Sequence, residues 1–325
     1  MRHFKRLKSI GLTLLLAVPF TSTAQTVLKL GHIYDSSHPW HDSAVEIADR
    51  IASKTDDRVK IEIFSNGTLG SEQELLEQVI TGGVDIAEIS SGQLGNVFKP
   101  MVITEMPYIF KDTDHLMRFF ASDIAQQMFD DFKDQFNVHL LGSSSWGVRH
   151  VIGSKPVTYP EDMNSFKLRV PEQSITVAYA KAMGSKPTPV PYTEAYLAMR
   201  QNMVDGLENP LGSIQTMKFY EVGNELSLTG HVITAVHFAV NDASLAALSA
   251  DDRQVVLDEF ERSAQDTANK VVKADNEALT FMKSKGVKVT QTDREAFQAK
   301  TKSMSDDYAG YWKKYGDLYT IIQQL

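Results

Sequence analysis

The sequence predicts an α/β protein of two domains, each built on a mixed, mostly parallel sheet flanked by helices. Short β-rich runs alternate with amphipathic helical patterns, the alternation starts again after residue 135, and one helical pattern runs without Pro or Gly over 250–285. Strands that alternate with helices favour a parallel sheet covered by helices. The chain is also longer than a single hydrophobic core usually supports, which favours two domains.

The first 24 residues have the pattern of a secretory signal peptide. Four basic residues precede an apolar stretch over 10–20, and the small residues Ser22 and Ala24 form a cleavage site. We expect cleavage after Ala24 and a mature protein in the bacterial periplasm. The alternative, an uncleaved anchor, is disfavoured because the apolar stretch is shorter than the ~18–20 residues that span a bilayer. The chain has no cysteine, so neither lipid attachment nor a disulfide is expected.

The charge of the mature chain excludes one class of partner. The full chain has 33 Lys and Arg and 41 Asp and Glu. Cleavage of the signal peptide removes four of the basic residues, so the mature chain has a net charge of −12. A protein this acidic, with no basic run, is a poor candidate for binding nucleic acid. An anionic ligand would need positive groups close to it, since distant charges are screened within ~8 Å in physiological salt.

The first half of the mature chain is predicted to contain three strands and two helices. The strands are expected at 26–33, 58–64 and 84–90, and the helices at 41–55 and 71–83. The second helix has both end signals, because Ser71 and Glu74 have capping-box spacing and a glycine pair follows its last turn.

The second half repeats this arrangement without repeating the sequence. After a helical region at 113–135, strands are predicted at 137–145, 167–170, 204–208 and 233–240, with helices at 173–183 and 193–202. The pattern over 250–285 predicts one helix of ~54 Å, long enough to lie across both domains. Two helices with an unmarked break are the alternative. A strand at 286–291 and a helical tail follow.

No Pro-, Gly- or Ser-rich linker separates the two halves, so we expect the chain to cross between domains more than once. The first domain is expected to comprise 25–146 with 235–274, and the second, which holds the ligand carboxylate, 147–234 with 275–325. Several crossings form a hinge, and the cleft between hinged domains is a natural ligand site.

Enzyme motifs are missing from the sequence. It has no G-x-S-x-G, H-E-x-x-H, phosphate-loop or G-x-G-x-x-G pattern, and the serines of "GSSSWG" have no readable base partner. A secreted hydrolase is therefore the weakest alternative, and no cofactor is expected. His38 and His41 are three residues apart, but two histidines flanking a proline are a weak metal signal, so no metal site is predicted.

Polar residues at predicted strand ends indicate the ligand chemistry. Arg149 follows one strand, Arg169 alternates with apolar residues inside another, and Asn209 and His32 end two more. Ligands of open α/β sheets bind at strand ends, and the planar arginine fork suits a carboxylate. The alternative for each arginine is a surface ion pair of ~0–1 kcal/mol. Trp146 could form a wall against a sugar face or simply pack in the core.

These residues also lie in stretches that resemble the substrate-binding subunits of TRAP transporters, the DctP-type family. The resemblance covers nearly the whole mature chain in order. It is carried by "WGVRHVIGSKPV", "FKLRVPEQ", "PTPVPYTEAYLAMRQNMVDGLENP", "MKFYEVGNELSLTGHV", "GTLGSEQELLEQVITGGVDIAEIS" and "EMPYIFKDTDHL".

The resemblance implies a two-domain periplasmic binding protein, monomeric in our expectation, that closes around an organic acid. It would deliver the acid to membrane permease subunits driven by an ion gradient. The family pattern implies that Arg169 makes a bidentate salt bridge to the ligand carboxylate, with Arg149 and Asn209 as further ligand residues. It also implies a long helix across both domains.

Within the family, the chain resembles the branch that binds uronates and related sugar acids. Candidates for contacts with sugar hydroxyls are His32, Glu72, Glu88, Gln93 and His150. Each has a simpler alternative, such as a helix N-terminus for Glu72 or solvent for Glu88.

Glu172 also belongs to the expected ligand residues. Its carboxylate would repel a second ligand carboxylate and could accept bonds from hydroxyls instead. A C4-dicarboxylate or 2-keto acid remains the alternative ligand, and a membrane sensor is a further possible partner.

Overall fold

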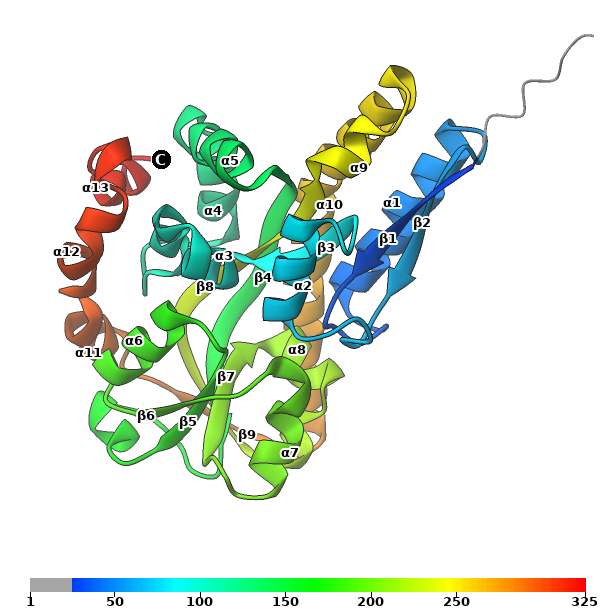
Figure 1. Cartoon of the computed structure of the whole chain (residues 1–325). Helices are drawn as coiled ribbons and strands as arrows, with labels where there is room; N and C mark the ends of the chain where they lie inside the picture. The colour runs from blue at the N-terminus through cyan, green and yellow to red at the C-terminus, as the bar shows by residue number, and fades with distance from the viewer. Residues whose placement is uncertain (1–24) are drawn as a thin grey trace, which may run out of the picture.

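The computed structural model describes residues 25–325, so the predicted signal peptide lies outside the described residues. These residues form one nine-stranded sheet of order β2-β1-β3-β8-β4-β7-β5-β6, with β9 paired to β8. Figure 1 shows an upper lobe around β1–β3 and a lower lobe around β5–β7, joined through the long strands β4 and β8. The two lobes therefore share a sheet.

The upper lobe begins with the predicted strand–helix alternation. Strands β1 (Thr26–Gly31), β2 (Val59–Phe64) and β3 (Ile86–Ser90) are parallel neighbours, with β1 in the middle. Helices α1 (Pro39–Lys54) and α2 (Glu72–Thr81) connect them.

The capping box at the start of α2 is confirmed. Ser71 Oγ accepts the N–H of Glu74, and the Glu74 carboxylate accepts the N–H of Ser71. The helix ends at Gly82, whose φ of 78° places it in the left-handed region that glycine adopts readily.

Short helices complete the upper lobe. The predicted helical region 113–135 is two helices, because Ala121 and Ser122 end the first and cap the second. The elements are α3 (Ser91–Val97), the 3-10 turn η1 (Lys99–Glu105), α4 (Thr113–Phe120), α5 (Asp123–Phe136) and α9 (Asp242–Ala246).

The strands β4 (Val138–Gly153) and β8 (Glu225–Asn241) run antiparallel through both lobes. Both are longer than the sequence predicts, because three bulges and the glycines 142 and 147 interrupt the β pattern without ending the strand. The register shifts between Ser145 and Gly147 and again between Arg149 and Val151. Arg149 therefore lies inside a strand instead of following one.

The lower lobe holds the predicted second set of strands. Strand β5 (Lys167–Val170) lies between β6 (Lys186–Pro189) and β7 (Gly206–Pro210), and all three are parallel. The sequence does not predict β6, since "KPTP" contains two prolines; it is an edge strand, where proline is tolerated. The helical elements are η2 (Pro160–Met163), α6 (Ser174–Ala182), η3 (Tyr192–Glu194), α7 (Ala195–Arg200), α8 (Leu211–Thr216) and η4 (Phe219–Glu221).

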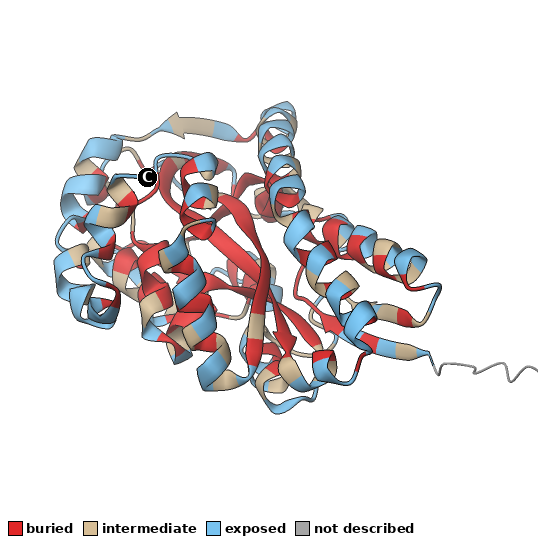
Figure 2. Cartoon of the chain, turned by 90° about the horizontal axis from the view of Figure 1, so that it is seen from above, coloured by how far each residue is buried: buried red, intermediate tan, exposed pale blue. Residues whose placement is uncertain are grey.

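The predicted long helix is a single helix, α10 (Ala250–Ser284). It packs against α1 of the upper lobe, β4 in the middle and α8 of the lower lobe. Figure 2 shows the buried residues gathered on the central strands, while the outward faces of the helices are exposed. Among the described residues, no helix is long and apolar enough to cross a membrane.

The C-terminal segment leaves the lower lobe and returns to the upper one. After β9 (Lys288–Gln291), α11 (Arg294–Thr301) packs against α6. The tail comprises α12 (Met304–Tyr308), η5 (Ala309–Tyr311), η6 (Lys313–Tyr315) and α13 (Leu318–Gln323). Tyr315 donates to Asp131 of α5, and His115 of α4 bonds the carbonyl of Ile322. We therefore propose that the tail belongs with the first domain, although the sequence assigns 275–325 to the second.

We expect loss of the buried carboxylate that joins α1 to α10 to destabilise the fold. Glu259 is 1 % exposed and pairs with Lys54 and with Arg50 Nε at 2.6 Å. Replacing Glu259 with Ala should lower the free energy of unfolding by about 2–3 kcal/mol, since charge-assisted bonds in a buried setting are lost. Urea denaturation measures the effect. Glu277→Ala removes an exposed carboxylate of the same helix and serves as control; equal losses in the two variants would contradict the expectation.

Candidate functional site

Arg169 is a fully buried guanidinium without a carboxylate partner among the described residues. It lies in β5, and its Nε and Nη2 both donate to the carbonyl of Val190, at 2.9 and 2.6 Å. Its Nη1 is buried and has no hydrogen-bond partner. Burial lowers the pKa of Arg169 to about 10, so the group stays cationic at neutral pH. A buried cation with a free N–H group is suited to binding an anion.

Arg149 is held by a carboxylate of the protein itself. Its Nε and Nη2 bond the two carboxylate oxygens of Glu208, and Nη2 also donates to the Glu208 carbonyl at 2.9 Å. Burial alone would raise the pKa of Glu208, but the charge and hydrogen bonds of Arg149 outweigh it and lower the pKa to about 2. The fork of Arg149 is therefore engaged by Glu208, a residue that the sequence analysis does not single out.

Two buried groups surround this ion pair. His231 Nε2 lies 3.3 Å from Glu208, and burial lowers the pKa of the imidazole. Glu105, from η1, accepts a hydrogen bond from Thr234 at 2.7 Å. Burial raises the pKa of Glu105 to about 7, although the nearby charge of Arg149 acts in the opposite direction.

A small group of residues holds the buried polar atoms that have no hydrogen-bond partner within the described part of the protein. Among the described residues, eight buried side-chain oxygens and nitrogens have no hydrogen-bond partner. They belong to Asn209, Arg169, Glu88, Tyr34, Tyr179 and Tyr192. Three of these are predicted ligand residues, whereas the tyrosines are not. Buried polar groups are normally satisfied, so these donors and acceptors are available to another molecule.

The upper lobe contributes carboxylates. Glu88, in β3, is fully buried, and burial raises its pKa well above the usual range. Glu72, at the start of α2, accepts the N–H of Ser90 at 2.6 Å, and burial raises its pKa too. Gln93 lines the same cavity as Glu72. His32 is instead occupied within the protein, since its ring nitrogens bond His41 and the N–H of Tyr34.

Trp146 forms an aromatic wall beside Arg149. Its ring centroid lies 5.1 Å from that of Tyr34 and 5.8 Å from that of Tyr192. Its indole N–H donates to His38, which in turn bonds Ser213, so the ring is fixed in place. The ring packs in this aromatic cluster and also lines the cavity of Arg169, so a wall against a sugar face stays a prediction.

Two predicted residues lie apart from the buried groups. His150 accepts the N–H of Gly230, and burial lowers its pKa to about 3; its bonding partner is in β8 and not in the cavity. Glu172 is exposed at the rim of the cavity, where its backbone carbonyl accepts a bond from Asn96. Among the described residues, no cluster of three or more metal-ligating side chains is found.

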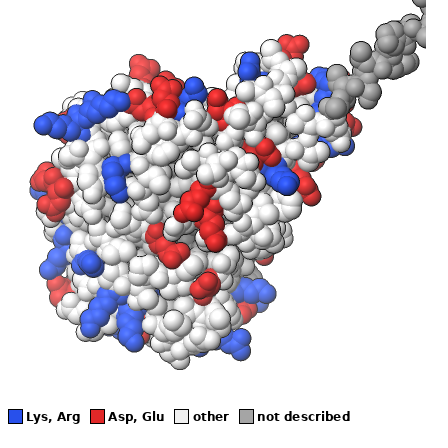
Figure 3. Space-filling view, viewed as in Figure 1, with Lys and Arg blue, Asp and Glu red and all other residues white. Residues whose placement is uncertain are grey.

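A small cavity between the lobes is lined by some of these groups. It is lined by Arg169, Tyr192, Pro191, Thr193, Pro171 and Glu172 from the lower lobe, Trp146 from β4, and Ile33, Ser71, Glu72, Gln73 and Gln93 from the upper lobe. Its volume of about 20 Å³ holds little more than one water molecule, so a sugar acid requires the lobes to separate. On the face shown in Figure 3, acidic side chains lie near the middle as well as at the edges, and basic ones lie mainly toward the edges.

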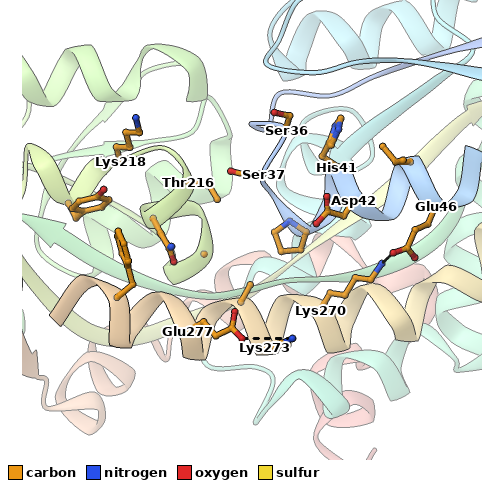
Figure 4. Close-up of a pocket in the computed structure, with 17 residues that line it drawn as sticks. Ser36, Ser37, His41, Asp42, Glu46, Thr216, Lys218, Lys270, Lys273 and Glu277 are labelled. Atoms are coloured by element: carbon orange, nitrogen blue, oxygen red, sulfur yellow. Dashed lines mark ion pairs between the residues drawn. The ribbon is translucent and has the colours of Figure 1, made fainter. Parts of the chain in front are cut away.

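A larger hollow of about 960 Å³ lies on the side of the hinge, between the start of α1, α8 and α10 (Figure 4). Its charged groups are of both signs, and Lys270 pairs with Glu46 across it at 2.6 Å. It does not include Arg169, which lines the smaller cavity, so we assign the candidate site to the smaller cavity.

The raised pKa of Glu105 predicts a pH-dependent stability. In the folded protein the Glu105 carboxyl keeps its proton up to about pH 7, whereas an ordinary glutamate loses its proton near pH 4.5. The contribution of Glu105 to the free energy of unfolding is therefore lost as the pH rises between these values. Glu105→Gln cannot titrate. The free energy of unfolding of this variant relative to the wild type should therefore increase by about 3 kcal/mol from pH 4.5 to pH 8.

Urea denaturation at several pH values measures this difference, with the exposed Glu161→Gln as control. A difference between Glu105→Gln and the wild type that stays constant with pH would show that Glu105 titrates normally.

Comparison with known proteins identifies the family of this chain. The model of bacterial extracellular solute-binding proteins, family 7 (DctP), matches residues 30–310. The sialic acid-binding periplasmic protein SiaP of Vibrio cholerae is 32% identical over 295 residues, which cover 90% of this chain and 92% of that protein.

Two crystal structures of TRAP periplasmic solute-binding proteins are similar at 28% identity. One, from Chromohalobacter salexigens with bound D-glucuronate, has a TM-score of 0.87 and covers 91% of this chain and 99% of its own. Another, from a Polaromonas species with D-erythronate, has a TM-score of 0.86 and covers 92% and 98%. The chain therefore belongs to the DctP family of TRAP solute-binding proteins, which bind small organic acids for transport and are not enzymes.

Proposed function

We propose that this protein captures a sugar acid with one carboxylate, with a hexuronate favoured, and delivers it as a monomer to the membrane subunits of a TRAP transporter. The observation that carries the proposal is the guanidinium of Arg169, which is buried, cationic and unpaired at Nη1. In the proposal, Arg169 forms a bidentate salt bridge with the ligand carboxylate, after the lobes open and close again around the ligand.

The charges around Arg169 favour a single carboxylate. Arg169 and Arg149 supply two positive charges, and Glu208 supplies one negative charge that its low pKa keeps ionised. The raised pKa values of Glu72 and Glu88 favour their neutral forms. Arg169 is thus left as the guanidinium of the two that has no carboxylate partner among the described residues, which suits one ligand carboxylate. A second carboxylate would lie near these acids and near Glu172.

The other unpaired polar groups suit hydroxyls. Glu88 and the phenols of Tyr34 and Tyr192 are unpaired donors and acceptors, and Asn209 offers an amide. Trp146 offers an apolar ring face of the kind that packs against a sugar ring. The three relatives described above bind sialic acid, D-glucuronate and D-erythronate, which are all acids with several hydroxyls. This set favours a sugar acid over a dicarboxylate.

Closure and binding are coupled in this proposal. An unpaired buried charge costs several kcal/mol, so an anion at Arg169 stabilises the closed form far more than the open form. A ligand shifts a conformational equilibrium only by such a difference in affinity. The buried guanidinium therefore makes closure depend on an occupied site.

We expect Arg169→Ala to weaken binding of D-glucuronate at least a hundredfold, because the proposed bidentate salt bridge is worth about 3 kcal/mol or more. Arg169→Lys keeps the charge but loses the fork, so it should recover only part of the affinity. Titration calorimetry measures both variants. Arg200→Ala removes an exposed arginine of the same lobe and is the control. Near-normal affinity in Arg169→Ala would refute the proposed role.

A panel of ligands distinguishes the sugar acid from the alternative. We expect D-glucuronate, D-galacturonate and hexonates to raise the melting temperature, and succinate, malate and 2-keto acids without hydroxyls to have little effect. A thermal-shift assay, followed by calorimetry of each positive compound, gives the ranking. Stronger binding of a C4-dicarboxylate or 2-keto acid than of every sugar acid would replace the proposed ligand with the alternative.

A further inference from the structure

We propose that Gln173 is a clasp that holds the two lobes closed and so sets the lifetime of the bound state. The clasp consists of Gln173 on the lower lobe and Ser90, Gly92 and Glu72 on the upper lobe. The inference rests on the proposed function in one respect, namely that the protein works by opening and closing around a ligand. Gln173 acts as a positioning residue, through closure, and makes its bonds to the protein.

The side chain of Gln173 crosses from one lobe to the other. It lies at the residue before α6 and is 5 % exposed. Its Nε2 donates to Ser90 Oγ at 2.9 Å, and Glu72 Oε2 lies 3.4 Å from the same nitrogen. Ser90 and Glu72 belong to the ends of β3 and α2, so these contacts connect the lower lobe to the upper one.

Gly92 provides the space for the clasp. A Cβ on this residue would lie 2.0 Å from Gln173 Oε1 and 2.7 Å from its Cδ, distances that no real Cβ shows. The three nearest atoms to that position all belong to Gln173. The missing side chain of Gly92 in α3 therefore leaves room for the amide of Gln173, and any larger residue would keep the amide out.

Asn96 adds a second contact of the same kind. Its Oδ1 accepts the N–H of Ser174, and its Nδ2 donates to the carbonyl of Glu172, both at 3.0 Å. The side chain of Gln173 does not cap the first turn of α6. Asn96 of the other lobe accepts the N–H of Ser174 in its place. The bonds of Gln173 are buried, whereas those of Asn96 are exposed, so the buried clasp should contribute more to closure.

Removing the clasp should open the protein. Each net hydrogen bond is worth about a fivefold change in an equilibrium constant. We expect Gln173→Ala to increase the ratio of open to closed protein, and the rate of ligand release, about five- to tenfold. Gly92→Ala should do the same, because its methyl group prevents the amide from inserting; alanine also favours a helix, so α3 should stay folded.

The two substitutions should not be additive. In a Gln173→Ala background, the methyl group of Gly92→Ala no longer meets the amide, so the second substitution should change the open-to-closed ratio by less than twofold. Additive effects of the two substitutions would overturn the clasp. Gln201→Ala, an exposed glutamine of the same lobe, is the matched control.

The lobe separation can be measured directly because the chain contains no cysteine. Glu77→Cys and Lys181→Cys, on exposed positions of α2 and α6, accept spin labels whose distance distribution reports opening. Samples without ligand and with D-glucuronate, D-galacturonate and D-erythronate are compared, and stopped-flow gives the release rate.

A shift of the spin-label distances toward longer values in Gln173→Ala, with or without faster ligand release, supports the clasp. An unchanged distribution together with unchanged release would overturn it, as would a wild type that is open in every sample. If the wild type closes but binds none of the acids, the result counts against the proposed ligand class and leaves the clasp supported.

Discussion

The cost of burying the guanidinium of Arg169 is the constraint on which the arrangement of the site depends. Two of its nitrogens are satisfied by a single backbone carbonyl, and the third is left free between the lobes. A buried cation without a counter-charge is unfavourable, so the closed form requires compensation from elsewhere. Three tyrosines, Asn209 and Glu88 also have buried polar atoms without a partner. In the proposed function, the ligand supplies both the negative charge and the hydroxyls that these groups lack.

The pair of Arg149 and Glu208 sets the electrostatic balance of the cavity. Two close guanidiniums would repel each other and bind a dianion, whereas an ionised glutamate between the strands neutralises one of them. The pair also fixes β4 to β7, the two strands that carry Arg149 and Asn209. Arg149 therefore supports the site through the scaffold and its charge, while Arg169 offers the free donor. The two arginines, which look equivalent as residues at strand ends, have different environments.

Much of the fold could be predicted because its signals are local. The capping box of α2 and the uninterrupted pattern of α10 each lie within one element, and both were found at the expected positions. The lengths of β4 and β8 could not be predicted, because their glycines and bulges resemble turns until the partner strand is known. Arg169, inside one predicted strand, and Asn209, at the end of another, could be singled out as candidates from these positions, and their roles stay predictions. Glu208 and Gln173 were missed because their roles depend on contacts with β4 and α3, which are distant in the sequence.

The continuity of the sheet has a consequence for how the molecule denatures. Strands β4 and β8 and helix α10 belong to both lobes, so neither lobe can lose its structure without disrupting hydrogen bonds and packing in the other. The chain should therefore melt in a single cooperative transition, although its shape suggests two independent units. Occupancy of the cleft would then protect regions far from it, including β1 and β2 at one edge and β6 at the other.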